Sequence, residues 1–294
     1  MPIRSNKRHL NTPLSLLVVF FTVAIVSPWV RAEQPSPTLI TLAPHLTELV
    51  YTSGAGQHLV GVVEYSNWPE AALDLPRIGD AFRFDMEAIV SLDPDLALAW
   101  RGGTPKAVVD QLEALGISVV WIETQTLDDI DTALRQIGQL AGTSAVAEDR
   151  AEAYAAKLAA LEKVSSGDAS QRLVRIFYQI SDRPLYTFGG QHVINEVFAM
   201  CHANNIFGHV ETQALSVDRE SVLARQPDVI LSGHEPSVDQ TTQPLRLWER
   251  HLDGPLADTT LQSIDPNVLV RPTPRILEGI ETLCQLLNAH RNNQ

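Results

Sequence analysis

Two ten-residue segments of this chain have similar sequences and align, 133 positions apart, without a gap. The first copy, at residues 87–96, reads EAIVSLDPDL, and the second, at 220–229, reads ESVLARQPDV. In each copy an aspartate stands two positions before the glutamate, and a Pro-Asp pair leads into an apolar run typical of a buried strand. Repetition at this distance favours two lobes of similar structure over one continuous sheet.

Strand and helix patterns alternate around the first copy. Segments that begin at Pro44 and Pro105 carry apolar residues at helical spacing and end at glycines. Four short apolar runs fit buried strands, at 39–43, 59–63, 96–100 and 119–122. This order predicts parallel strands joined by crossover helices.

The stretch 127–164 has a different composition, rich in Ala, Leu, Glu and Lys and without proline. Its second part, 144–164, has apolar residues at helical spacing and predicts a helix of about 21 residues, roughly 30 Å long. We interpret it as the connection between the lobes, because its heptads are too few to favour the alternative, a coiled coil or partner helix.

The predicted fold class is therefore α/β, with two Rossmann-like lobes, each built on a central parallel sheet, joined by one long backbone helix. The predicted organisation is an N-terminal lobe at 33–143, a connecting helix at 144–168 and a C-terminal lobe at 169–294.

The first 32 residues predict a secretory signal peptide. Basic residues at positions 4, 7 and 8 precede an apolar run at 14–26, and Val30 and Ala32 are small residues suited to a cleavage site. The run is shorter than the about 20 residues of a membrane span, so an uncleaved anchor is the less favoured alternative. We expect a soluble periplasmic protein that begins at Glu33.

Removal of this segment leaves 18 Lys and Arg against 35 Asp and Glu, a formal net charge of −17 compared with −13 for the whole chain. Such a surface repels the phosphate backbone, so we expect no nucleic-acid partner. It suits a protein that approaches a basic partner.

The chain has two cysteines, Cys201 and Cys284, both in the C-terminal half. In an oxidising compartment such a pair usually forms a disulfide, and closing 83 residues would stabilise this half by roughly 4.5 kcal/mol. Two free thiols are the alternative, although no CxxC spacing indicates redox chemistry.

Glu87 and Glu220 have two interpretations. Locally, Asp85 and Asp218 are suitable N-caps, and a glutamate in the first turn is favoured by the helix dipole. By symmetry, one exposed carboxylate at equivalent points of two lobes suits docking on a two-fold membrane partner that bears arginines. A catalytic carboxylate pair is less favoured because the two residues belong to different lobes.

Six motifs of the sequence carry a resemblance to one protein family, and the most specific of them contains the Trp-Arg-Gly-Gly run. They are Thr47-Glu48-Leu49, Val62-Val63-Glu64-Tyr65-Ser66, Leu98-Ala99-Trp100-Arg101-Gly102-Gly103, Pro184-Leu185-Tyr186-Thr187, Asn205-Ile206-Phe207 and Val222-Leu223-Ala224-Arg225-Gln226-Pro227-Asp228. With them the chain, from Leu39 to nearly its C-terminus, resembles the cobalamin-binding proteins of bacterial uptake transporters. The resemblance implies that Glu87 and Glu220 dock on permease arginines. It also implies a disulfide between Cys201 and Cys284.

A corrinoid is a wide, flat ring with amide arms, so its site needs apolar faces and scattered polar groups. Open parallel sheets bind ligands in the loops at strand ends, where several aromatic residues lie. The resemblance implies that Tyr65 and Trp100 face the cleft; burial in the core is the alternative. Phe82 stands where we expect Trp in close relatives. Tyr186 and Arg271 complete the predicted ligand site, and a solvated arginine is the alternative for Arg271.

Other functions are less favoured than cobalamin binding. A ferric siderophore or haem is the alternative ligand, because the same fold class serves both. Nine histidines are present, but none forms an HxH or HxxxH pair, so we expect no metal site. The chain has no GxSxG elbow and no GxxxxGK loop, so we expect no enzyme and no catalytic residue.

The expected partners follow. The ligand is cobalamin or a related corrinoid, with no other cofactor. The protein is expected to be a monomer that delivers its ligand to an ABC permease dimer in the inner membrane.

Overall fold

In the computed structural model, the described residues are 1, 36–80, 83–165, 172–233 and 245–292. Nearly all of the predicted signal peptide lies outside them, and so does Phe82. Among the helices that are described, none has the length and apolar character needed to span a membrane.

The N-terminal lobe is built on a four-stranded parallel sheet with the order β2-β1-β3-β4. Its strands are β1 (Leu39–Thr41), β2 (Leu59–Val62), β3 (Leu96–Trp100) and β4 (Ser118–Ile122). Its helices include α1 (Pro44–Thr52), α2 (Met86–Leu92) and α3 (Lys106–Ala114). The four strands predicted from apolar runs are confirmed, with ends that move by one or two residues.

The C-terminal lobe repeats this sheet, in the order β8-β5-β10-β11, and its strands are also parallel. The strands are β5 (Val174–Gln179), β8 (Ala203–Asn205), β10 (Val229–Gly233) and β11 (Thr260–Ile264). The helices are α6 (Ile194–Met200), α7 (Arg219–Arg225), α8 (Arg246–Glu249), α9 (Pro266–Leu269) and α10 (Ile276–Asn292). Equal strand order in two sheets is the tertiary counterpart of the sequence repeat.

The C-terminal lobe also contains a small antiparallel sheet of β6 (Ser181–Asp182), β7 (Leu185–Phe188) and β9 (Ala214–Ser216). Tyr186 lies within β7, so the expectation that it occupies a strand-following loop is wrong. The antiparallel pairing of β7 with both neighbours holds this segment extended.

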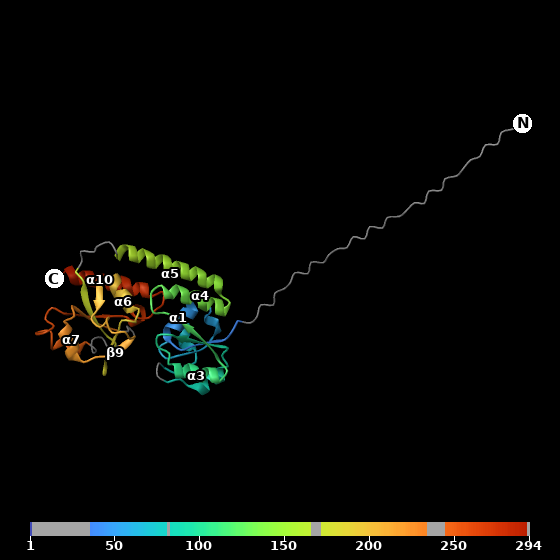
Figure 1. Cartoon of the computed structure of the whole chain (residues 1–294), viewed down its shortest axis with the longest axis horizontal. Helices are drawn as coiled ribbons and strands as arrows, with labels where there is room; N and C mark the ends of the chain where they lie inside the picture. Colours follow the sequence, from blue (N-terminus) through green and yellow to red (C-terminus); the bar gives the residue numbers. More distant parts are fainter. Residues whose placement is uncertain (2–35, 81–82, 166–171, 234–244, 293–294) are drawn as a thin grey trace. The chain divides into compact units, whose positions relative to one another are not determined.

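Two helices connect the lobes, α4 (Asp129–Ala141) and the long α5 (Ser144–Ser165). Gly142 ends α4 in the left-handed conformation, with φ of 74°. Figure 1 shows α5 alongside α4 and extending toward α10. The Tyr154 hydroxyl of α5 donates to the Leu127 carbonyl before α4 (2.9 Å), and Lys157 pairs with Glu281 of α10 (3.5 Å). The predicted long connecting helix, and with it the fold class, is confirmed.

One buried apolar cluster runs through both lobes. It contains Leu46 and Ile122 of the first lobe, Tyr154 of α5, and Ile176 and Leu283 of the second. Each lobe has a further cluster on the other face of its sheet. Both parallel sheets are therefore covered on two faces, as their continuous apolar strands require.

The repeated segment forms a capped helix in each lobe. The Asp85 carboxylate accepts from the Ala88 backbone N–H (3.0 Å) at the start of α2, and Asp218 accepts from Ser221 (2.6 Å) at the start of α7. Glu87, like its counterpart in α7, lies exposed in the first turn. The predicted N-caps are confirmed.

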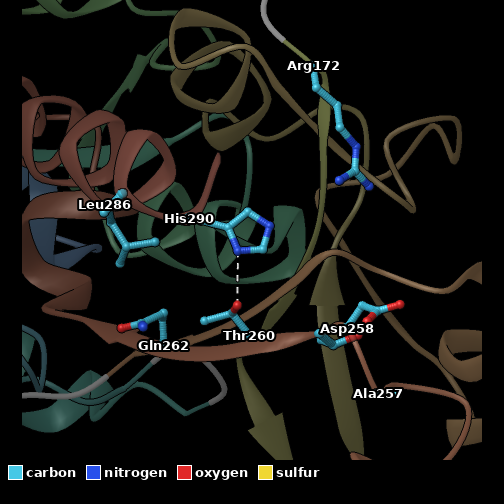
Figure 2. Close-up of a pocket in the computed structure, with 9 residues that line it drawn as sticks. Arg172, Ala257, Asp258, Thr260, Gln262, Leu286 and His290 are labelled. Carbon is cyan, nitrogen blue, oxygen red and sulfur yellow. Dashed lines mark hydrogen bonds between the residues drawn. The ribbon is translucent and has the colours of Figure 1, made fainter. Parts of the chain in front are cut away.

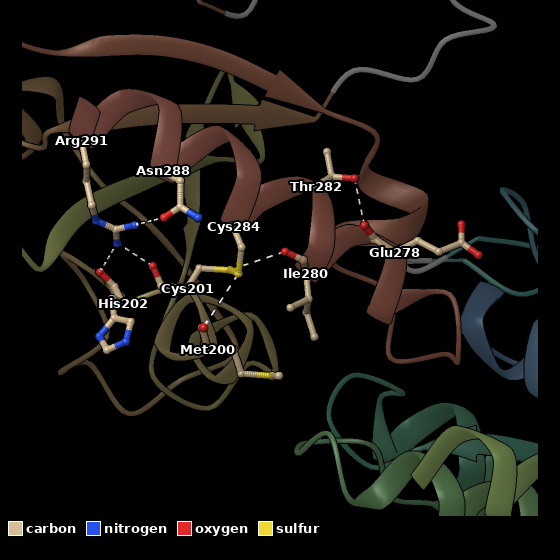
Figure 3. The surroundings of a disulfide bond; sticks show 9 residues. All are labelled: Met200, Cys201, His202, Glu278, Ile280, Thr282, Cys284, Asn288 and Arg291. Atoms are coloured by element: carbon tan, nitrogen blue, oxygen red, sulfur yellow. Dashed lines mark hydrogen bonds between the residues drawn. A yellow bond between two sulfur atoms is a disulfide. The ribbon is translucent and has the colours of Figure 1, made fainter. Parts of the chain in front are cut away.

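A disulfide joins Cys201, at the end of α6, to Cys284 in α10, which confirms the predicted pairing. Figure 3 shows Arg291 beside it, reaching the carbonyl oxygens of Cys201 (2.6 Å) and His202 (2.9 Å). The disulfide and the guanidinium together fasten α10 to the chain that leads into β8.

We predict that replacing both cysteines, Cys201→Ser with Cys284→Ser, lowers the free energy of unfolding by about 4 kcal/mol, because the unfolded chain loses an 83-residue loop closure. Chemical denaturation monitored by circular dichroism measures the change. Thiol titration of the denatured, unreduced wild type should find no free thiol; two thiols per chain would contradict the prediction.

Candidate functional site

The candidate site is a concavity of about 250 Å³ in the N-terminal lobe, at the carboxyl ends of β1, β2 and β3. This is the edge at which open parallel sheets bind ligands. Its lining is mainly apolar and aromatic and includes Pro44, His45, Val63, Tyr65, Phe84, Trp100 and Pro105. The two aromatic residues expected to face a cleft, Tyr65 and Trp100, thus line one concavity.

Trp100 occupies the end of β3, and its surroundings explain the Trp-Arg-Gly-Gly run. A Cβ atom at Gly103 would lie 2.3 Å from the indole, and one at Gly102 would lie 2.7 Å from it. Only glycine lets the chain fold this closely over the ring. The indole N–H is buried and has no acceptor within the described part of the chain.

Tyr65 follows β2 with a ring that is 73% exposed and a left-handed φ of 64°. This conformation is unfavourable for a residue with a side chain, so neighbouring contacts must hold it. One such contact comes from the other lobe, since Arg271 donates from Nη2 to the Tyr65 carbonyl (3.0 Å).

Arg271 connects the two lobes. Its Nη1 donates to Asn67 Oδ1 (2.7 Å), beside the bond to Tyr65. The alternative of a merely solvated arginine is therefore wrong. Just before Arg271 in the chain, the short helix α9 (Pro266–Leu269) forms because Asp265 caps it and proline suits its first position.

Two buried histidines lie close to this arginine and were considered in the sequence only as metal ligands. Burial removes the hydration of an imidazolium, which lowers the pKa of His45 to about 3 and that of His192 to about 3. The positive charge of Arg271 lowers the pKa of His45 further, and His192 adds to this effect. Both imidazoles are therefore neutral at neutral pH; His45 lines the concavity, and His192 belongs to the C-terminal lobe.

Each imidazole is held by specific contacts. His45 meets the Trp100 indole edge-on at 5.0 Å, and its Nε2 lies 3.4 Å from Thr124 Oγ1. His192 stacks on Phe188 at 3.8 Å, and its Nδ1 accepts from the Ile194 backbone N–H (3.1 Å). Across the described residues, no group of three or more His, Cys, Asp or Glu side chains could hold a metal ion.

A buried ion pair joins the lobes behind the concavity. Glu48 of α1, only 1% exposed, accepts from Nε (2.7 Å) and Nη2 (2.8 Å) of Arg275, which is 19% exposed. Burial alone would lower the pKa of Arg275, but its hydrogen bond to Glu48 and the charge of that carboxylate raise it. The guanidinium also lies over the Trp68 ring at 4.3 Å.

The counterpart of Glu48 makes the reciprocal contact. Glu196 of α6 accepts from the Leu127 backbone N–H in the other lobe (2.6 Å), and its half-burial raises its pKa. In the sequence, a polar residue precedes each of these glutamates, Thr47 before Glu48 and Asn195 before Glu196. An isolated glutamate within an apolar helix face is the signal that could have identified these contacts.

The remaining predicted residues lie elsewhere. Tyr186 is exposed in β7 and does not line the concavity. Phe82 is outside the described residues. Glu87 and Glu220, on α2 and α7, are also absent from its lining. Their roles and that of Tyr186 stay predictions.

A larger cavity, of about 730 Å³, lies in the C-terminal lobe beside β11 and α10. Figure 2 shows its side chains, with His290 Nδ1 2.9 Å from Thr260 Oγ1. Its lining contains Arg172, Asp258 and Gln262 and no Phe, Tyr or Trp. A wide apolar ring is better matched by the smaller aromatic concavity, so lining rather than volume identifies the candidate site.

We predict that His45 and His192 make stability pH-dependent. Between their ordinary pKa of 6.5 and about 3, the unfolded chain binds protons that the native chain excludes, so stability falls as the pH is lowered through this window. Each histidine contributes up to about 1.4 kcal/mol per pH unit. The variant His45→Gln with His192→Asn, which keeps comparable polar atoms, should show a smaller loss of unfolding free energy between pH 6.5 and 4.5. An equal loss in both proteins would contradict the prediction.

Comparison with known proteins agrees with this architecture. A family model described as periplasmic binding protein matches residues 39–247. The vitamin B12-binding protein of Vibrio cholerae is 32% identical over 93% of this chain and 98% of the relative. The vitamin B12-binding protein of Vibrio campbellii is 34% identical over 86% of this chain and 90% of the relative.

Solved structures extend the comparison. The periplasmic vitamin B12 binding protein BtuF of Vibrio cholerae superposes with a TM-score of 0.76 at 32% identity, covering 87% of this chain and 98% of that structure. The periplasmic heme-binding protein RhuT from Roseiflexus superposes with a TM-score of 0.73 at 22% identity, covering 87% and 99%. The second likeness shows the shared fold alone.

Proposed function

The chain belongs to the periplasmic binding protein family, and we propose that it captures cobalamin or a related corrinoid between its two lobes and delivers it to an ABC permease. In this proposal the protein works in the periplasm as a monomer, without catalysing a reaction. The predicted signal peptide and the family support that location.

The observation that carries the proposal is the combination of an aromatic concavity with relatives named for vitamin B12 binding that match nearly the whole chain. At about 250 Å³ the concavity is smaller than the roughly 300–1,000 Å³ of sites that enclose a drug-sized ligand. It can therefore cover only part of a corrinoid, and the facing C-terminal lobe would cover the rest.

The proposed contacts follow from the chemistry of the ligand. The rings of Tyr65 and Trp100 offer apolar surface to the flat corrin. Arg271 stands at the rim, where it supports the Tyr65 backbone and can donate to a ligand amide or phosphate. Neutral His45 adds no charge.

We predict that the purified mature protein carries the visible absorbance of cyanocobalamin through gel filtration. Trp100→Ala should weaken binding by about tenfold or more, because a buried aromatic anchor is lost. Tyr65→Ala should weaken it as well, measured by isothermal titration calorimetry, while the control Val164→Ala on the exposed end of α5 should not.

Haem and a ferric siderophore serve as competing ligands in the same gel filtration. A wild type that carries haem or the siderophore but no cyanocobalamin would contradict the proposal. The affinities of Tyr186→Ala and Phe82→Ala then report whether these two predicted residues touch the ligand.

Delivery to a permease is the second part of the proposal. Glu87 and Glu220 are exposed and lie at equivalent positions of two capped helices, and their carboxylates have no hydrogen bond or ion pair in the described part of the chain. A pair of exposed carboxylates related by an approximate repeat suits arginines on a two-fold partner.

We predict that Glu87→Arg with Glu220→Arg abolishes cobalamin uptake by the cell and leaves cyanocobalamin affinity unchanged. Uptake of radiolabelled ligand and calorimetry measure the two effects. Glu152→Arg with Glu162→Arg, on the exposed surface of α5, is the matched control and should retain uptake. Uptake that survives the first pair of substitutions would exclude the docking role.

A further inference from the structure

A groove of about 900 Å³ lies beside Glu220 in the C-terminal lobe. It is formed by segments from three parts of the chain, the turn between β6 and β7, the start of α7, and α8. Its charged lining is Asp182, Arg183, Asp218, Arg219, Glu220, Arg246 and Arg250. We call this feature the arginine groove.

The arginines of the groove are largely uncompensated. Within the described residues, the side chains of Arg219, Arg246 and Arg250 make no hydrogen bond or ion pair. Arg183 is 90% exposed and lies 3.4 Å from the neighbouring Asp182. Arg246 and Arg250 are four positions apart and therefore lie on one side of α8. The groove gathers positive charge on a chain whose formal net charge is −13.

Of the acidic residues of the groove, only Asp182 forms an ion pair with a groove arginine among the described residues. Hydrogen bonding to the Ser221 side chain and to the Ser221 backbone N–H lowers the pKa of Asp218. Glu220 has no partner among the described residues. The groove therefore presents separate positive and negative groups at one surface.

At the positions equivalent to Arg219 and to α8, the described N-terminal lobe carries no arginine. Helix α3 stands between β3 and β4 as α8 stands between β10 and β11, but its Lys106 is paired with Asp110 on the same helix. Met86 occupies the repeat position of Arg219, one residue before the exposed glutamate. The arginine groove thus distinguishes two otherwise similar docking faces.

We propose that the arginine groove receives carboxylate side chains of the permease, beside the contact made by Glu220. This inference rests on the proposed delivery function. Arginine forks bind carboxylates through two parallel hydrogen bonds, so an acidic periplasmic loop complements the groove. Because Arg219, Arg246 and Arg250 have no arginine at the equivalent described positions of the other lobe, the contact selects one of the two orientations in which a two-lobed protein can sit on a two-fold partner.

Permease carboxylates suit the groove better than anionic phospholipid headgroups. Glu220 forms part of the same wall, and a phosphate-bearing membrane surface repels it. A protein partner can place an arginine opposite Glu220 and carboxylates opposite Arg246 and Arg250. A uniformly anionic surface cannot match both signs.

The test measures the association of the mature protein with the cobalamin permease of the source bacterium, which is reconstituted in phosphatidylcholine nanodiscs. Arg246→Gln with Arg250→Gln should weaken association by about tenfold at low salt, mainly through a slower association rate. Arg150→Glu, an exposed and unpaired arginine of α5 among the described residues, changes the net charge by the same two units and should have little effect. Cyanocobalamin affinity and the unfolding midpoint should be unchanged in both variants.

Each outcome decides the proposal. Equal association of the wild type and the double-glutamine variant overturns the groove assignment and leaves the proposed function intact. A wild type that does not bind the permease overturns the delivery function and the groove assignment together. Wild-type binding to permease-free phosphatidylglycerol nanodiscs that the variant loses would identify phospholipid as the partner and also overturn the assignment.

Discussion

The buried ion pair of Glu48 with Arg275 is the contact on which the arrangement of the two lobes depends. Both groups are largely removed from water, and the guanidinium satisfies the carboxylate through two bonds of 2.7 and 2.8 Å. Removing one partner of such a pair leaves an uncompensated buried charge and typically costs about 3–5 kcal/mol. Separation of the lobes at this point would therefore break the ion pair and leave its charges without their partners.

The rest of the lobe interface reinforces this pair. Glu196 accepts from Leu127 of the opposite lobe, and the shared apolar cluster extends through α5 into both sheets. Arg271 adds two hydrogen bonds to the loop that contains Tyr65. These contacts determine where His192 and Arg271 stand relative to the aromatic concavity, because both residues belong to the C-terminal lobe.

Ligand capture and partner docking use different parts of the same repeat. The first helix of each lobe, α1 or α6, carries the glutamate that reaches across the interface. The helix that precedes the third strand, α2 or α7, carries the exposed glutamate assigned to docking. In the proposed function, the ligand binds between the lobes, and the surface of both lobes presents carboxylates to the permease. The C-terminal lobe also presents the arginine groove.

The features that could be predicted from the sequence are those that depend on short-range patterns. Strands β1 to β4 and the long helix α5 follow from the spacing of apolar residues. The capped helices α2 and α7 follow from an aspartate that accepts a hydrogen bond from the backbone N–H three residues later. The pairing of Cys201 with Cys284 follows because the chain has only two cysteines. The family resemblance implied that Tyr65 and Trp100 face the cleft; both line one concavity, and their contact with a ligand stays a prediction.

Tertiary structure alone decided the contacts between the lobes. Arg271 meets Tyr65 across 206 positions of sequence, and Arg275 meets Glu48 across 227. No local pattern encodes such a pairing, because it depends on how two complete sheets pack against α4 and α5. The same holds for the neutral histidines and the arginine groove, whose members become neighbours only when separate segments fold together. The repeated segment around Glu87 and Glu220 thus predicts two lobes from sequence alone, whereas the packing of the folded chain determines which residues meet between the lobes.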